Sequence, residues 1–150
     1  VAPGAGKGRG LQLLPEIGDE VLVGFEQGDL NHPYVLGGLW NNVDGPVAND
    51  AVLNNQVQQR VIRSRSGHRI LLEDGDSGGR ILIEDAHGNA LLLDTASDEL
   101  RIRVEGNLSL SAGGDLALDA SGKVTIVGKG VAIDGTSGTV DITGLRINLN

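Results

Sequence analysis

The stretch that decides the fold reads Leu-Ser-Leu-Ser-Ala-Gly-Gly-Asp over residues 108–115 and returns as Leu-Ala-Leu-Asp-Ala-Ser-Gly-Lys over residues 116–123. Three further versions follow, each with two apolar residues around a polar or small residue and closed by a turn of Gly, Asp or Ser, and the period is about eight residues. Such alternation is typical of a half-buried β-strand. Because so short a unit cannot bury its own apolar face, it must stack on further copies, from the same chain or from other chains. The repeat therefore predicts a β-solenoid or a β-prism.

In a prism of this kind, alternate residues of each strand point into a narrow interior and the others face water. The repeat then predicts which apolar residues form the core of the shaft. They are Leu108, Leu110, Leu116, Leu118, Val124, Ile126, Val131, Ile133, Val140 and Ile142.

The composition suits a narrow interior better than a globular core. The chain has 150 residues with 24 glycines and no methionine, and Phe25, Tyr34 and Trp40 are its only aromatic residues. Aromatic side chains normally bury the most area per residue, so a globular core would have little material here. No segment has a helical period of apolar residues, and we expect an all-β protein with essentially no helix.

Charge and cysteine content exclude several classes of function. A net charge of −8 repels phosphate backbones, so nucleic-acid binding is not expected. The absence of cysteine excludes disulfides, zinc knuckles and thiol catalysis. No apolar run approaches the roughly 20 residues of a membrane-spanning helix.

The first third of the chain predicts short strands separated by turns. Residues 1–10 are Gly-rich and predict a loop, and residues 11–14 predict a short strand ended by Pro15. Clear strand patterns follow at residues 20–26 and 34–40. Residues 41–55 are rich in Asn, Asp, Gly and Pro and predict a linker.

Residues 56–66 contain three arginines and predict a neck strand, in which the arginines pair with acidic residues of other chains. From residue 67 onwards apolar triplets come in steps of about ten residues, and we expect each to pair with strands of two other chains. The triplets are residues 70–72, 81–83, 91–93 and 102–104.

Residues 15–41 carry a long motif, Pro-Glu-Ile-Gly-Asp-Glu-Val-Leu-Val-Gly-Phe followed by an acidic turn and then Pro-Tyr-Val-Leu-Gly-Gly-Leu-Trp-Asn. This motif resembles the OB-fold of the VgrG and phage baseplate spike proteins, and Ser-Gly-His at residues 66–68 resembles the next element of that family. The matching residues are Pro15, Gly18, Asp19, Glu20, Val21, Val23, Phe25, Pro33, Gly37, Leu39, Trp40 and Asn41.

The resemblance implies a homotrimer in which part of an OB-fold precedes an intertwined trimeric β-helix. Residues 1–53 would be the C-terminal part of the OB-fold, residues 54–67 the neck, and residues 68–150 the shaft and tip. The implied function is a non-enzymatic, membrane-piercing spike of a phage tail, a type VI secretion system or an extracellular injection particle. Such a spike is assembled in the cytoplasm, then secreted or carried on a particle, and it meets the target cell envelope.

The resemblance also implies partners at both ends. An OB-fold has five strands, and only about three fit before Asn41, so the chain resembles a C-terminal fragment whose upstream region contacts tail-tube and baseplate proteins. No histidine follows His87 in the sequence, so we do not expect the iron site that some phage spikes have at the tip. We expect no cofactor. A PAAR-type tip protein or an effector would dock on the last residues, which are Leu145, Arg146, Ile147, Asn148, Leu149 and Asn150.

Several alternatives remain open on the sequence. A β-helical adhesin or glycan-binding stalk would share the repeat, and a polysaccharide hydrolase would use paired carboxylates. His68 and His87 match no metal-ligand spacing, although three symmetry-related histidines could meet on an axis. Residues 113–119 resemble a calcium-binding β-roll only faintly, because the tandem copies are missing.

Overall fold

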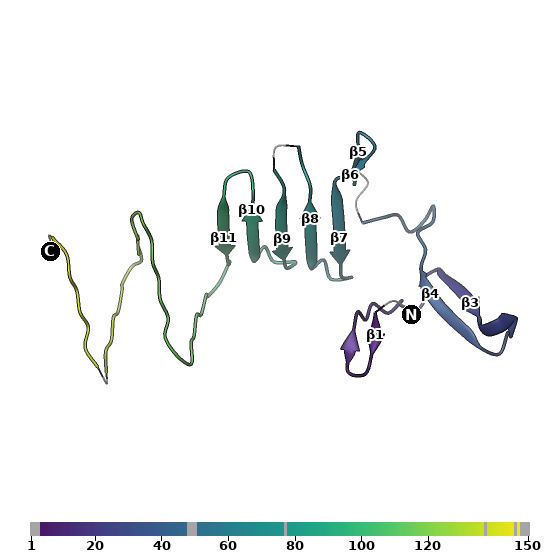
Figure 1. The fold of residues 1–150 in the computed structure, drawn as a ribbon, viewed down its shortest axis with the longest axis horizontal. Coiled ribbons are helices and arrows are strands. Elements are labelled where there is room, and N and C mark those ends of the chain that lie inside the picture. Colours follow the sequence, from purple (N-terminus) through teal and green to yellow (C-terminus); the bar gives the residue numbers. More distant parts are fainter. Residues whose placement is uncertain (1–3, 48–50, 77, 137, 146, 148–150) are drawn as a thin grey trace. The chain divides into compact units, whose positions relative to one another are not determined.

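The computed structural model describes residues 4–47, 51–76, 78–136, 138–145 and 147, and it is mostly β (Figure 1). Within these ranges there is no α-helix, and the single helical turn is the 3-10 turn η1, Glu26–Gly28. No helix of the described residues has the length and apolar character to cross a membrane. The chain divides into two units, Val1–Leu108 and Ser109–Asn150.

The first hairpin lies where the sequence predicts a loop. Strands β1 (Ala5–Gly6) and β2 (Arg9–Gly10) pair in antiparallel fashion, and the Leu11 N–H extends the hairpin by donating to the Gly4 carbonyl at 3.1 Å. The strand predicted at residues 11–14 is wrong, since no strand is assigned there. Apolar residues alone do not make a strand when no neighbouring strand accepts their backbone hydrogen bonds.

The second hairpin confirms the two strand patterns at residues 20–26 and 34–40. Strands β3 (Val21–Phe25) and β4 (Pro33–Gly38) pair in antiparallel fashion, with a shift of register between Leu22 and Val23. The turn η1 connects them, and the Glu26 N–H donates to the His32 carbonyl at 3.1 Å at the base of the loop.

A third, very short hairpin interrupts the predicted linker. Strands β5 (Val52–Leu53) and β6 (Gln56–Val57) flank Asn54 and Asn55, whose φ angles are +53° and +61°. Two consecutive positive φ angles define a two-residue turn of type I′, in which asparagine is tolerated better than most residues.

The largest element is a five-stranded antiparallel meander in the order β11-β10-β9-β8-β7 (Figure 1). Its strands are β7 (Gln59–Arg63), β8 (Arg69–Glu73), β9 (Arg80–Glu84), β10 (Ala90–Asp94) and β11 (Glu99–Arg103). The expectation that these strands pair with other chains is wrong, because each pairs with its neighbours in the same chain. A step of about ten residues accommodates both a five-residue strand and a turn long enough to reverse direction.

The second unit is extended and has no assigned strand among its described residues. Its eight-residue step leaves little chain for a reversal after each triplet, and a strand is assigned only where a partner strand completes the hydrogen bonds. The trimeric β-helix and the division at residues 53 and 67 remain predictions.

Candidate functional site: the open face of the meander

The register of the meander sorts its side chains onto two faces. Residues directly opposite each other in an antiparallel pair lie on the same face, so Ile62, Ile70 and Ile83 form part of one row. We call the face that carries this row and the parallel row through Leu72 the open face. Its apolar members are Ile62, Ile70, Leu72, Ile81, Ile83, Leu91, Leu93, Leu100 and Ile102.

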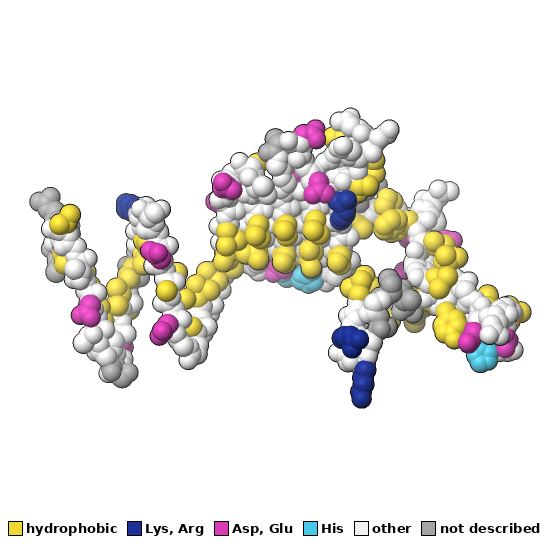
Figure 2. All heavy atoms as spheres, viewed as in Figure 1, with side chains coloured by type: hydrophobic (Ala, Val, Ile, Leu, Met, Phe, Trp, Pro, Cys, Tyr) yellow, Lys and Arg dark blue, Asp and Glu magenta, His cyan; other side chains and the backbone are white. Residues whose placement is uncertain are grey.

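The open face is apolar and uncovered. Eight of its nine apolar side chains expose between 38% and 63% of their surface, and hydrophobic side chains form a continuous band over β7–β11 in Figure 2. A continuous apolar face of this kind marks an interaction surface.

The opposite face, which we call the closed face, is completed within the chain. Its central row contains Leu71 and Leu82, which expose only 3% and 9% of their surface. Two cross-strand ion pairs flank this row, Arg69 Nε with Glu84 Oε1 at 2.6 Å and Arg80 Nη2 with Glu73 Oε2 at 3.0 Å. The aliphatic stems of such side chains cover apolar neighbours while their charged groups stay in water.

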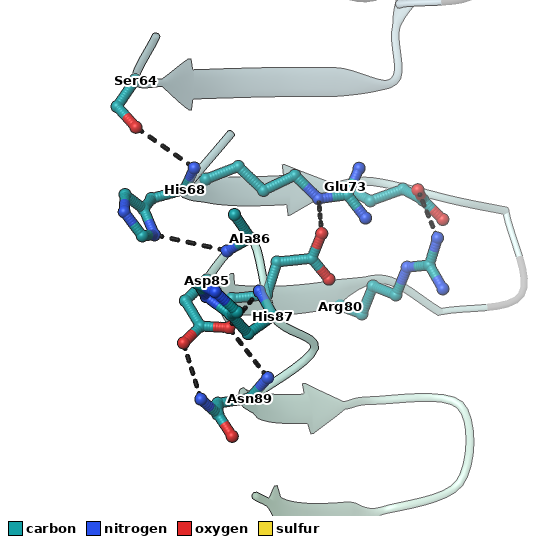
Figure 3. A network of polar contacts seen from close by, with 10 residues as sticks. Ser64, His68, Glu73, Arg80, Asp85, Ala86, His87 and Asn89 are labelled. Carbon is teal, nitrogen blue, oxygen red and sulfur yellow. Dashed lines mark hydrogen bonds and ion pairs between the residues drawn. The ribbon is translucent and has the colours of Figure 1, made fainter. Parts of the chain in front are cut away.

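Polar contacts join the loops at one end of the meander (Figure 3). In the β7–β8 loop the His68 N–H donates to Ser64 Oγ at 3.1 Å, and the Ala86 N–H of the β9–β10 loop donates to His68 Nδ1 at 3.3 Å. The His68 imidazole thus acts as a hydrogen-bond acceptor. Among the described residues, no three or more His, Cys, Asp or Glu side chains gather as a possible metal site.

Asp85 organises the β9–β10 loop. Its carboxylate accepts hydrogen bonds from the Asn89 side chain at 2.6 Å, from the His87 N–H at 2.8 Å and from the Asn89 N–H at 2.9 Å. These contacts, first of all the one from the Asn89 side chain, lower the pKa of Asp85. Asn89 Oδ1 also accepts from the Glu105 N–H at 2.8 Å, which ties the loop to the end of β11.

The structure gathers the OB-like motif around the β3–β4 hairpin. The Glu16 N–H donates to Asp19 Oδ2 at 2.8 Å in the turn before β3. Glu20 then joins both ends of the hairpin, because its carbonyl accepts from the Leu39 N–H at 2.8 Å and its Oε2 accepts from Asn41 Nδ2 at 2.9 Å. This hydrogen bond to Glu20 explains why the motif ends with an asparagine at residue 41.

The same hairpin carries a second side-chain contact near its loop. The Tyr34 hydroxyl donates to Glu26 Oε2 at 2.8 Å, and this contact raises the pKa of Tyr34. Trp40, just beyond β4, is exposed.

The predicted shaft core is not brought together within one chain. All ten of its side chains, from Leu108 to Ile142, are exposed, and the nine after Leu108 belong to the extended unit. Of the predicted tip residues, Leu145 and Ile147 are described and exposed, while Arg146, Asn148, Leu149 and Asn150 lie outside the described residues.

Sequence reasoning missed the open face as a site. The signal was present in segments such as residues 80–84, Arg-Ile-Leu-Ile-Glu, where charged residues bracket an apolar triplet. The outer two residues of such a triplet share a face, and the middle one lies with the bracketing charges on the other. Only the register shows that the outer residues of five strands line up.

Residues 1–40 match the family described as the type VI secretion system/phage-baseplate injector OB domain. The match covers the β1–β2 and β3–β4 hairpins and ends just before Asn41. The comparison with curated proteins gives no match to the chain.

Proposed function

We propose that this chain is a subunit of a homotrimeric spike in a contractile injection machine, and that the spike pierces a target envelope mechanically. The observation that carries the proposal is the open face, nine apolar side chains on one sheet that the chain leaves uncovered. The match of residues 1–40 to an injector OB domain connects that sheet to this class of machine. The proposed role needs no catalytic residue.

Copies of the same chain are the partners that suit the open face best. Three open faces turned towards one axis would bury one another and leave three closed faces in water. The interior would then contain Leu and Ile in layers, which is the narrow filling that this aromatic-poor composition provides. The apolar residues of the extended unit have the same requirement, since they too are exposed in the single chain.

Leu145–Asn150 would form the tip of the spike. Extended segments that end together leave open strand edges, on which a partner can add a strand. We propose a PAAR-type tip protein or an effector as that partner. Tube and baseplate proteins would contact the assembly at the OB end.

Light scattering on a sizing column tests the proposal with one variant and one control. We expect the wild-type chain to have three times the 15.5 kDa mass of one chain, and Ile83→Asp to lose the trimer because it places a charge in the centre of the open face. Ser97→Asp, in the exposed turn between β10 and β11, should stay trimeric. A monomeric wild-type chain with a folded meander would overturn the proposal.

A further inference from the structure

Three strands of the meander carry opposite charges at their two ends. β8 begins with Arg69 and ends with Glu73, β9 begins with Arg80 and ends with Glu84, and β11 shows the reverse order, Glu99 to Arg103. Four residues of extended strand span about 13 Å, so these charges cannot pair within one strand.

Across the meander the strand ends form two charged rows on the closed face. The basic row has three arginines and one glutamate, and the acidic row has three acids and one arginine. The basic row is Arg63, Arg69, Glu84, Ala90 and Arg103, from β7 to β11. The acidic row is Gln59, Glu73, Arg80, Asp94 and Glu99 in the same order.

The two rows are complementary strand by strand. When the basic row of one copy is set beside the acidic row of another, β8, β9 and β11 each bring opposite charges together. The strands β7 and β10 each bring a charge next to a neutral residue. No strand brings like charges together.

Other alignments of the rows are less favourable. A shift by one strand brings Arg69 to Arg80 and Glu84 to Asp94 and leaves one opposite pair, Arg63 with Glu73. A shift in the other direction brings Glu84 to Glu73 and leaves one opposite pair, Arg103 with Asp94. Two copies joined by equivalent edges would set the basic row against itself. Like charges placed directly opposite each other are destabilising.

Pairing within the chain explains only part of this pattern. The ion pairs Arg69–Glu84 and Glu73–Arg80 stabilise β8 against β9. At the edges of the sheet, however, Glu99 lies opposite Asp94, and Arg63 lies opposite Arg69. Both are like-charge neighbours across the strands. On β11, Glu99 Oε2 lies 2.7 Å from Arg101 Nη2, and Arg103 Nη2 lies 2.5 Å from Glu105 Oε1. Exposed ion pairs of this kind add little stability, so cross-strand pairing does not account for the charges at the ends of β7 and β11.

We propose that the two rows form the seams between copies of this chain, with the basic row of each copy beside the acidic row of the next and equal strands at equal height. This head-to-tail contact is heterologous and closes into a ring. The rows thereby set the direction and the register in which the open faces come together. The inference rests on the proposed homo-oligomeric spike and specifies how its subunits recognise one another.

Charge exchange on β11 gives the first test. Glu99→Arg should lower the urea midpoint for dissociation of the full-length trimer, because each seam then brings two arginines together, and Arg103→Glu should lower it by a similar shift. The double variant restores opposite charges and should recover most of the midpoint. Within the chain, Glu99→Arg loses the ion pair with Arg101 and Arg103→Glu loses the pair with Glu105. The double variant restores neither pair, so intrachain effects alone predict shifts that add. A raised midpoint, or shifts that add in the double variant, would overturn the seam.

Cross-linking gives the second test, since the chain has no cysteine. The double variant Glu99→Cys/Arg103→Cys should yield covalent trimers on a denaturing gel after treatment with a bis-maleimide. The reagent should be shorter than the separation of the two residues in one strand, so that it cannot join them within one chain. The control, Arg80→Cys with Arg103→Cys, sets the two sites two strands apart along the seam and should stay monomeric on that gel. If the wild-type chain is trimeric by light scattering but shows neither the charge effects nor the cross-link, the proposed seam is wrong and the proposed spike still stands. A monomeric wild-type chain overturns the proposed spike.

Discussion

Leu71 lies directly opposite Leu82 in the β8–β9 pair, and these two are the most buried side chains among the described residues. The ion pairs Arg69–Glu84 and Glu73–Arg80 flank them on either side. This cluster is the part of the core that a single chain makes for itself. The larger apolar surface lies on the other face of the same sheet and depends on a partner.

Shortening Leu71 to Ala should therefore destabilise the meander in any state of assembly. We expect a loss of about 2–4 kcal/mol in the free energy of unfolding, because the change leaves a cavity between the two central strands. Urea unfolding followed by circular dichroism measures it. Val43→Ala, at a residue that is 89% exposed, should change the free energy by no more than about 0.5 kcal/mol. Equal losses for the two variants would contradict the assignment of the core.

Gly79 should not tolerate a side chain. A Cβ at this position would lie 2.3 Å from the Glu73 carbonyl oxygen, a backbone atom that cannot rotate away. We expect Gly79→Ala to cost about 1–3 kcal/mol through displacement of the β8–β9 loop. Gly45→Ala, where a Cβ meets nothing within 4 Å, is the control. Thermal unfolding of both variants checks the difference, and an unchanged Tm for Gly79→Ala would show that the loop is positioned differently.

The β9–β10 loop should weaken in acid because of Asp85. Hydrogen bonds from the Asn89 side chain and from nearby backbone N–H groups lower the pKa of Asp85 in the folded chain. A lowered folded pKa means that the contribution to stability is complete above the unfolded pKa of about 4 and is lost as the pH falls through the folded value. The urea midpoint of the wild-type chain should fall as the pH is lowered from about 6 to about 3, and the midpoint of the Asp85→Asn variant should fall less. Asp115→Asn, an exposed carboxylate of the extended unit, should keep the full dependence.

The sequence predicts where the strands of this chain lie better than it predicts their partners. Alternation located β3, β4 and the four triplets of β8 to β11, because period-two patterning is a local property of the strand. It did not show that β8 to β11 pair with one another, since pairing depends on whether the turns are long enough to reverse the chain. The hairpin at Asn54 and Asn55 was missed for a similar reason, because its strands are only two residues long and its signal is in the turn.

The open face could be predicted only in part. Each triplet shows that its outer residues share a face, but the faces of neighbouring strands align only once the register is known. The charged rows are a second case, because Glu99 and Arg103 resemble ordinary surface residues until their strand is set beside the others.

Removal of Leu145–Asn150 separates the tip from the rest of the proposed spike. The truncated chain should remain trimeric, because the open face and the repeats of residues 108–142 are unchanged, and it should lose binding to a PAAR-type tip protein. Co-purification of that protein with full-length and truncated chains measures the loss, and light scattering confirms the assembly. Leu145→Ser alone should weaken binding less than the deletion, since strand addition relies mainly on backbone hydrogen bonds and less on one side chain. Undiminished binding to the truncated trimer would place the docking surface elsewhere on the shaft.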